Sequence, residues 1–306
     1  MKKILVIGAN GFLGTHLTKA FSKMGDEVVA LVGKGTDFSS VSNIENVICI
    51  EFSLGKFKEV TNLIPEGIST AYILAWVGVS SSVKNECDLQ TQNISYMMEI
   101  MECLDALNIK RVIVPGSASE FACSDAVITG YNAPAPSDFY SAAKISARYL
   151  CGVYAKTHNM EFIWTLISSI YGPGRRDSNL ITYAICSLLK GESPEFTKLE
   201  QQWDYIYIDD AIEALTELQD KGIDGKMYPI GSGVSKPLSE YVSIIHNLIA
   251  PDVPLKIGAL PYKTSIIDNQ IMDISQIVQD IGFKPKYSFA EGISQTIEYF
   301  RENIDR

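Results

Sequence analysis

Tyr140 and Lys144 form a pair whose residue types and spacing could do chemistry. They stand four residues apart in the stretch Y-S-A-A-K. The surrounding pattern predicts a helix over residues 138–157, which would place both side chains on one face, one turn apart. A tyrosine hydroxyl with a pKa of about 10 is a poor acid or base at neutral pH, but a nearby ammonium group stabilises the phenolate and lowers that pKa. The pair is therefore a candidate for proton exchange with a substrate oxygen.

A serine cluster upstream could complete this pair. Ser117 ends the stretch R-V-I-V-P-G-S, which has the pattern of a strand followed by polar residues. In an open parallel sheet, ligands bind beyond the carboxyl ends of the strands. A serine hydroxyl there could polarise a substrate carbonyl and orient it. A tyrosine and a lysine at this spacing also occur often by chance, so the interpretation depends on the rest of the chain.

A glycine-rich turn near the N-terminus supports the catalytic interpretation. G-A-N-G-F-L-G spans residues 8–14, after the apolar stretch K-I-L-V-I and at the start of a helix predicted near 12–24. Gly8 would permit a tight turn, Gly11 would let backbone N–H groups approach a pyrophosphate, and Gly14 would let the helix pack closely on the sheet. The spacing differs from the G-x-G-x-x-G of the commonest dehydrogenases, and a plain strand-to-helix turn is the alternative. The candidate cofactor-binding residues are Gly8, Asn10, Gly11, Phe12, Leu13, Gly14, Lys34, Leu74, Ala75, Tyr140 and Lys144.

The end of the second predicted strand, E-V-V-A-L-V, bears on which nicotinamide cofactor is bound. A carboxylate there would hydrogen-bond the adenosine ribose and favour NAD, whereas its absence beside a cation accommodates the 2′-phosphate of NADP. No carboxylate stands at Val32 or Gly33, and Lys34 offers a positive charge. Lys34 could equally be a solvated loop residue, and Asp37 could still reach a ribose. The sequence therefore favours NADP(H), with NAD as the alternative.

Strands alternate with helices through the first two thirds of the chain. Short β-branched runs such as V-I-C-I-E-F and F-I-W-T-L-I are separated by amphipathic stretches, with helices expected near 55–63 and 88–107 as well as 138–157. Parallel strands need crossover connections, so the pattern predicts an α/β fold with a Rossmann-type, doubly wound parallel sheet. A smaller, interleaved α-rich lobe should bind substrate. We expect a dinucleotide-binding domain of residues 1–172 plus about 204–235, and a substrate-binding lobe of about 173–203 plus 236–306.

Composition argues against several other classes of protein. The 306 residues carry a formal net charge of −10, which disfavours nucleic acid and anionic membranes as partners. The opening M-K-K-I-L-V-I-G is too short for the apolar core of a signal peptide, and no stretch approaches the roughly 20 apolar residues of a membrane helix. The six cysteines are scattered singly and the three histidines are not paired at ligand spacing, so we expect no disulfides and no metal site. A cytoplasmic location is expected.

Together these motifs resemble those of the extended short-chain dehydrogenase/reductase superfamily, in its NAD(P)-dependent epimerase/dehydratase branch. The later stretches Y-G-P-G at 171–174, W-D-Y-I-Y-I-D-D-A at 203–211 and Y-P-I-G-S-G at 228–233 are also similar to that branch, so the resemblance covers nearly the whole chain. It implies hydride transfer between a nicotinamide and a sugar carbon. In that reaction Tyr140 exchanges the hydroxyl proton, Lys144 binds the nicotinamide ribose, and Ser117 bonds the reacting oxygen.

The residues that follow Ser117 bear on the type of reaction. Where the 4,6-dehydratases of this branch have an acidic pair, the chain has Ala118 and Ser119, and Glu120 comes one residue late. Without a carboxylic acid there, elimination of water loses its general acid and base. We therefore predict an NADP(H)-dependent reductase of a nucleotide-activated 4-keto-6-deoxy sugar. The alternatives are an NAD-dependent nucleotide-sugar 4-epimerase, a reductase of a non-sugar ketone and, from another class, a non-catalytic nucleotide-binding sensor or scaffold.

Four residues are candidates for binding the nucleotide sugar: Ser119, Arg175, Arg176 and Trp203. Arginine side chains match phosphate oxygens, so Arg175 and Arg176, in the loop after Y-G-P-G, could bind a diphosphate or could be solvated. Trp203 stands where the branch commonly has an arginine that binds the diphosphate, a departure that resembles a group of deoxysugar reductases. Its indole could stack on the base or pack between the lobes.

Two further expectations concern Asp209 and Asp210 and the association of subunits. Asp209 and Asp210 could suggest a metal site, but adjacent carboxylates on a strand point to opposite faces, and we expect them to cap the helix that follows. In this superfamily the long helices expected near 88–107 and 138–157 commonly pair with their copies, so the resemblance implies a homodimer. The apolar residues that would permit this pairing are Met97, Met98, Ile100, Met101 and Leu104.

Overall fold

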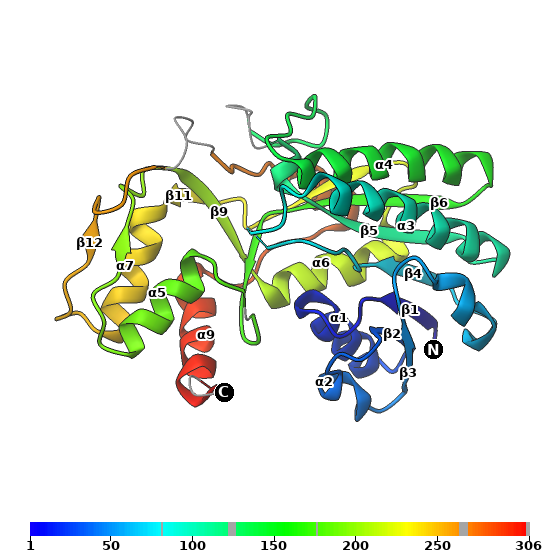
Figure 1. Ribbon diagram of the computed structural model, residues 1–306, viewed down its shortest axis with the longest axis horizontal. Helices are drawn as coiled ribbons and strands as arrows, with labels where there is room; N and C mark the ends of the chain where they lie inside the picture. Colours follow the sequence, from blue (N-terminus) through cyan, green and yellow to red (C-terminus); the bar gives the residue numbers. More distant parts are fainter. Residues whose placement is uncertain (81, 122–126, 176, 263–268, 304–306) are drawn as a thin grey trace.

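A parallel β-sheet forms the largest layer of the protein. The computed structural model describes residues 1–80, 82–121, 127–175, 177–262 and 269–303. Its main sheet has seven strands in the order β10-β6-β5-β4-β1-β2-β3, and every neighbouring pair is parallel (Figure 1). The strands are β1 (Lys3–Ile7), β2 (Glu27–Gly33), β3 (Val47–Phe52), β4 (Thr70–Ile73), β5 (Arg111–Ser117), β6 (Glu161–Ile167) and β10 (Met227–Ile230).

The strand order confirms the predicted doubly wound, Rossmann-type topology. From β1 the chain proceeds to β2 and β3 on one side, and then crosses to β4, β5 and β6 on the other. The switch point therefore lies between the carboxyl ends of β1 and β4, which is where ligands bind in open α/β sheets.

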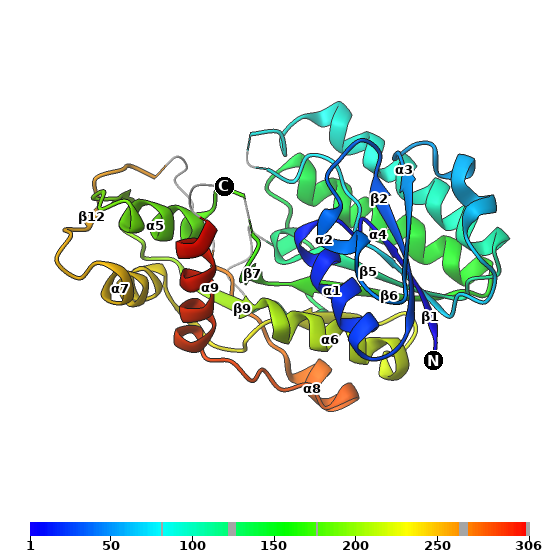
Figure 2. The same cartoon turned by 90° about the horizontal axis from the view of Figure 1, so that it is seen from below.

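Both faces of this sheet are buried under helices, as the apolar strand sequences require. Along β1, Ile4 and Val6 belong to one hydrophobic cluster and Leu5 and Ile7 to another, and all four are fully buried. Figures 1 and 2 show a pair of helices on each side of the sheet. These are α1 (Phe12–Lys23) and α6 (Ile208–Lys221) on one face, and α3 (Cys87–Ala106) and α4 (Phe139–Thr157) on the other.

A second group of elements follows β6. β9 (Gln202–Tyr207) pairs in parallel with β7 (Ser169–Tyr171) and antiparallel with β11 (Ser235–Pro237), which makes a three-stranded sheet separate from the large one. β8 (Glu195–Phe196) and β12 (Lys256–Ile257) form a parallel pair. The helices of the C-terminal half, besides α6, are α5 (Leu180–Leu189), α7 (Leu238–Ile249), α8 (Ser275–Ile281) and α9 (Phe289–Asn303).

The chain passes more than once between the large sheet and the smaller region. α6 and β10 return to the large sheet after β9, and α8 packs against both of them. Residues 204–207, which the sequence assigns to the dinucleotide-binding domain, lie in β9 of the smaller sheet. The exact domain boundaries remain a prediction.

Three short helices complete the secondary structure of the described residues. The helix expected near 55–63 is a 3₁₀-helix, η1. The three are α2 (Ser39–Ser42), η1 (Phe57–Leu63) and η2 (Ala118–Phe121).

Asp209 and Asp210 do not lie on a strand, and the prediction that they cap the helix was wrong. β9 ends at Tyr207, which is the N-cap residue of α6, and no side chain caps that helix. Both aspartates are instead in its first turn, where negative charge complements the helix dipole. The Asp210 carboxylate accepts hydrogen bonds from the backbone N–H groups of Lys286 and Tyr287 at 2.9 and 3.1 Å. It thus fastens the C-terminal segment to α6.

The expected pairing of helices between subunits stays a prediction. Met97, Ile100, Met101 and Leu104 are buried in the chain's own core, and Met98 is partly buried against the same cluster. The large apolar side chains that α4 does expose beyond its first turn are Tyr149, Leu150 and Val153. Of the helices in the described ranges, none combines the length and the apolar character needed to cross a membrane.

Candidate active site

The glycine turn lies at the carboxyl end of β1, and packing requires two of its glycines. Gly8 has a φ of +91°, and a Cβ atom there would lie 2.8 Å from the backbone nitrogen of Ala75. A Cβ atom on Gly14 would lie 2.2 Å from the carbonyl oxygen of Gly8. Such contacts are closer than real side chains make, so only glycine lets α1 pack this tightly onto the turn.

Gly11 has no such packing requirement. It is exposed, and a Cβ atom there would lie no closer than 3.4 Å to its nearest neighbour, the Gly8 oxygen. Gly11 is the N-cap residue of α1, and no side chain caps this helix. The first N–H groups of a helix lack partners within it and carry partial positive charge. An open glycine in front of them fits the approach of a pyrophosphate, and Phe12 and Leu13 hold the first turn against the core.

Leu74 and Ala75 follow β4 directly beside this turn. Their backbone N–H groups donate to the carbonyl oxygen of Ile7 at 2.8 and 3.0 Å. They therefore lie at the switch point of the sheet, next to the start of α1.

Asn10 joins the glycine turn to the loop after β2. Its Nδ2 donates to Thr36 Oγ1 at 2.7 Å and to the Asp37 carbonyl oxygen at 3.2 Å, while its Oδ1 accepts from the Gly33 N–H at 3.2 Å. The two loops that would flank a dinucleotide are thus held together by one amide side chain.

The loop after β2 carries charges of both signs. Lys34 is exposed at its start. Glu51 reaches the same loop from the end of β3, and its Oε2 accepts a hydrogen bond from the Gly35 N–H at 3.0 Å. The sequence of β2 alone could not reveal this carboxylate, because it belongs to the neighbouring strand.

Tyr140 lies in the first turn of α4, whose start is fixed by polar contacts. Asp138 is the N-cap residue, and it forms a capping box with Ser141, whose N–H lies 2.8 Å from the Asp138 carboxylate. The Lys84 ammonium group lies 2.6 Å from the same carboxylate, and the Lys84 carbonyl oxygen accepts from the Tyr140 N–H at 3.0 Å. The loop before α3 therefore sets where the helix begins.

Burial has the largest effect on the pKa of Tyr140. It raises the pKa of Tyr140 to about 12, and a hydrogen bond with the Ser117 side chain offsets part of that rise. The sequence argument expects Lys144 to lower this pKa, but the lysine nitrogen lies 6.0 Å from the centre of the tyrosine ring. In this structure the phenol is protonated at neutral pH and can serve as a proton donor.

Lys144 lies one turn further along the same face of α4, where it is buried. Its ammonium group donates to the Pro115 carbonyl oxygen at 3.1 Å and lies 4.1 Å from the centre of the Trp76 ring. Burial lowers the pKa of Lys144 to about 8, and the negative charge of Glu120 opposes this effect. Trp76 is a neighbour of the site that the sequence motifs do not indicate.

Ser117 ends β5 and is oriented by Ser119. The Ser119 hydroxyl and backbone N–H donate to the Ser117 hydroxyl oxygen at 2.8 and 3.2 Å. Ser117 can therefore direct its own proton toward Tyr140 or a substrate oxygen.

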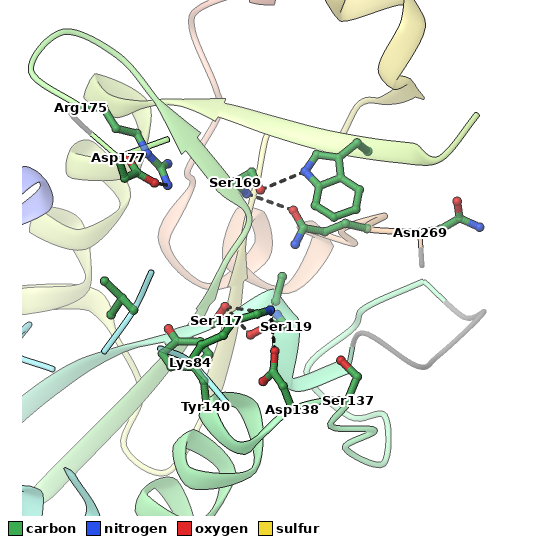
Figure 3. A pocket seen from close by; sticks show the side chains of 14 residues that line it. Lys84, Ser117, Ser119, Ser137, Asp138, Tyr140, Ser169, Arg175, Asp177 and Asn269 are labelled. Atoms are coloured by element: carbon green, nitrogen blue, oxygen red, sulfur yellow. Dashed lines mark hydrogen bonds and ion pairs between the residues drawn. The ribbon is translucent and has the colours of Figure 1, made fainter. Parts of the chain in front are cut away.

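Ser117, Ser119 and Tyr140 line a cavity of about 410 Å³ at the carboxyl end of the large sheet (Figure 3), whereas the buried Lys144 is not among its lining residues. Tyr140, Ser117 and Ser119 form one wall, and Arg175 and Asp177 lie across from them. Ser169, Trp203, Asn269 and Gln270 from the smaller region also line it, and the remaining lining residues are Val79, Lys84, Ala118, Ser137 and Asp138.

The two cations that line the cavity within the described ranges are each paired with a carboxylate. Arg175 donates to both Asp177 oxygens, at 2.5 and 2.9 Å, and to the Ile170 carbonyl oxygen. Lys84 is paired with Asp138. Arg176 lies outside the described residues. The indole N–H of Trp203 donates to the Ser169 hydroxyl at 2.9 Å. Because this residue is a tryptophan and not an arginine, it brings no positive charge to the cavity.

Comparison with known proteins identifies the family. The sequence profile of the NAD dependent epimerase/dehydratase family matches residues 4–231. The chain belongs to this family. Membership confirms the predicted superfamily and makes the protein an NAD(P)-dependent enzyme of the oxidoreductase type.

Relatives within the epimerase/dehydratase family have several activities. The chain is 25% identical to Protein CapI of Staphylococcus aureus and 24% identical to the UDP-glucose 4-epimerase of Mycolicibacterium smegmatis, with 98% of every chain covered. It is 30% identical to the dTDP-glucose 4,6-dehydratase of Shigella flexneri, over 58% of this chain and 52% of the relative. The solved UDP-glucose 4-epimerase of Thermotoga maritima has a TM-score of 0.90 at 20% identity, with 99% of both chains covered, which shows the shared fold.

Glu120 is not placed to serve as the acid that the elimination of water would need. It is fully buried and points away from the cavity, because its Oε1 accepts from the Ser117 N–H at 3.1 Å and from the Trp164 indole at 3.0 Å. It therefore does not replace the missing acid beside Ser117.

Sequence reasoning missed Lys84 and Asp138 as residues of the cavity wall. The D-F-Y-S stretch does contain a signal, since an aspartate three residues before a serine is typical of a capped helix start. Lys84 has no comparable motif. Within the described ranges, no group of three or more His, Cys, Asp and Glu side chains could hold a metal ion.

Proposed function

We propose that this protein reduces the 4-keto group of a nucleotide-activated deoxysugar. The observation that carries the proposal is that Tyr140 and Ser117 line a cavity where Ala118 and Ser119 stand in place of acids. The buried Lys144 lies one turn after Tyr140 on α4. A proton donor without a neighbouring acid–base pair supports carbonyl reduction and not the elimination of water.

The residues of the chain have separate roles in such a reduction. A bound nicotinamide supplies the hydride to the carbonyl carbon. The Ser117 hydroxyl holds the carbonyl oxygen, and Tyr140 gives that oxygen its proton as the carbinol forms. Lys144 supplies a positive charge 6.0 Å from the centre of the tyrosine ring, which favours the tyrosinate that remains but does not outweigh the effect of burial on the pKa of Tyr140.

A 4-epimerase is the second candidate, which the names of relatives matched over their whole length support. An epimerase returns the hydride to the opposite face, so the keto sugar must turn while its nucleotide stays bound. A strong diphosphate anchor would serve that motion. Trp203 in place of an arginine, and cavity cations already paired with Asp138 and Asp177, favour the reductase.

The form of the cofactor is a separate part of the proposal. The sequence favours NADP(H) because of Lys34. Two observations instead support NAD(H). The Glu51 carboxylate of β3 contacts the loop that holds Lys34 and would repel a 2′-phosphate. Solved proteins of similar fold were crystallised with NAD. We therefore propose NAD(H), with NADP(H) as the alternative.

The test is turnover of nucleotide-activated 4-keto-6-deoxy sugars with UDP, dTDP, CDP and GDP carriers, followed by the absorbance of the reduced nicotinamide. We expect stoichiometric oxidation of the nicotinamide with one carrier, and its loss in Tyr140→Phe. Tyr149→Phe is the matched control, since Tyr149 is an exposed tyrosine of the same helix.

Other outcomes would identify the alternatives. Interconversion of UDP-hexoses without net change in the nicotinamide would establish an epimerase. Nucleotide binding without turnover of any sugar, unaffected by Tyr140→Phe, would point to a sensor.

A further inference from the structure

We infer that Glu120 is a positioning residue of this site, whose buried carboxylate holds the Ser117 backbone from below and supplies the counter-charge for Lys144. The effect of Glu120 on the reaction rate rests on the proposed function, whereas its effect on the protonation of Lys144 does not.

The backbone around Ser117 is built to accommodate this carboxylate. Glu120 is 0% exposed, and its Oε1 receives the Ser117 N–H and the Trp164 indole N–H. A Cβ atom on Gly116 would lie 2.5 Å from that oxygen and 2.1 Å from the indole nitrogen. Glycine at position 116 therefore leaves the room in which the carboxylate and the indole meet.

The opposite oxygen of Glu120 faces positive charge. Glu120 Oε2 has no hydrogen-bond partner among the described residues, and Arg148 Nη1 lies 3.8 Å from it. Arg148 and Lys144 are four residues apart on α4, and so are Lys144 and Tyr140, so the three side chains follow one face of the helix. One buried carboxylate thus interacts with two cations of α4, Lys144 and Arg148.

A negative partner matters for Lys144 because burial favours its neutral form. Desolvation lowers the pKa of Lys144, and the charge of Glu120 is the largest effect that raises it again. A neutral lysine could not stabilise a tyrosinate. The titratable groups of α4 that interact with Glu120 or Lys144 are Tyr140, Arg148 and Cys151. Ser117 of β5 and Trp164 of β6 donate hydrogen bonds to Glu120.

Glu120→Gln separates charge from shape, since the amide keeps an oxygen for the Ser117 and Trp164 donors. The first measurement is the titration of Lys144 in the protein without substrate, by NMR of ¹³C-labelled lysine with Lys144→Arg as the assignment reference. We expect the midpoint to fall by about one pH unit. The second is the pH profile of turnover, in which the alkaline limb should move down by the same amount, with near-normal kcat at pH about 6.5.

Asp210→Asn is the matched control, because Asp210 is another buried carboxylate that accepts backbone N–H groups, remote from the cavity. It should lower thermal stability without moving the Lys144 midpoint. An unchanged midpoint in Glu120→Gln, or an equal loss of kcat at every pH, would overturn the inference. If Glu120→Gln does not fold, a comparison of Arg148→Gln with the double variant Glu120→Gln/Arg148→Gln gives a second test, since the double variant leaves no arginine beside the lost carboxylate. The Lys144 midpoint should be lower in the double variant, and equal midpoints would overturn the inference. A shifted midpoint in a protein that turns over no keto sugar would refute the proposed function and leave this role intact.

Discussion

The hydroxyl of Ser119 donates to the hydroxyl of Ser117 at 2.8 Å, so one serine orients the other at the end of β5. Ser119 comes from the position where elimination would require an acid, and here it serves the reacting serine instead. In the proposed reduction, this hydrogen bond would let the serine cluster act without a carboxylate.

Ser119→Ala should reduce kcat without changing cofactor affinity. Loss of one hydrogen bond to Ser117 leaves its hydroxyl less well oriented, and a bond of about 1 kcal/mol corresponds to roughly a three- to tenfold loss of rate. Steady-state kinetics and a binding titration with the nicotinamide check this. Equal kcat in the variant and the wild type would show that Ser117 needs no orienting partner.

Gly11→Ala and Gly14→Ala should fail in different ways. A Cβ atom at Gly14 lies 2.2 Å from the Gly8 oxygen, so the protein should lose about 1–3 kcal/mol or more of unfolding free energy. A Cβ atom at Gly11 meets nothing closer than 3.4 Å, so the fold should tolerate it while the nicotinamide dinucleotide binds at least about tenfold more weakly. Thermal melting and calorimetric titration separate the two effects. Normal binding by Gly11→Ala would mean that the cofactor does not approach this turn.

Lys34 and Glu51 should act oppositely on the choice between NAD and NADP. Glu51→Gln removes a negative charge from the loop after β2, so affinity for NADP should rise by roughly two- to fivefold, and Lys34→Ala should lower it by a similar factor. Neither change should alter NAD affinity as much. Lys56→Ala, an exposed lysine of the next loop, is the control. No response of NADP binding to either substitution would place the adenosine elsewhere.

Asp204 should make stability depend on pH. Burial raises the pKa of Asp204 to about 6, despite hydrogen bonds from Ser232 and Gly233. Because the folded protein binds this proton more tightly than the unfolded chain, the stabilisation is complete below pH about 4 and is lost as pH rises through about 6. Relative to wild type, Asp204→Asn should therefore gain roughly 2 kcal/mol of unfolding free energy between pH about 4.5 and 7.5. Urea unfolding at both values measures this, and a pH-independent difference would mean that Asp204 is ionised throughout.

Local patterns predicted the features that depend on local structure. The glycine turn at 8–14, the strand that ends at Ser117 and the helix that carries Tyr140 and Lys144 all lie where the sequence places them. Each follows from strand alternation or helical spacing, which neighbouring residues determine.

Features that depend on contacts between distant segments were not predictable in this way. The Glu51 carboxylate enters the loop after β2 from another strand, and Lys84 meets Asp138 across 54 positions of the chain. The pKa of Tyr140 rises because of burial, which the spacing of tyrosine and lysine does not report. Asp209 and Asp210 were placed wrongly because the aromatic run before them gives no sign of where the strand stops.

The attachment of Lys84 and Asn85 to the start of α4 limits how this enzyme could be redesigned. The Lys84 carbonyl oxygen receives the Tyr140 N–H, its ammonium group pairs with Asp138, and the Asn85 side chain accepts the Phe139 N–H at 3.4 Å. A graft of the connection between β4 and α3 from another family member, intended to change substrate range, would also move Tyr140, the proposed proton donor. Engineering of specificity should therefore transplant that connection and the first turn of α4 as one unit.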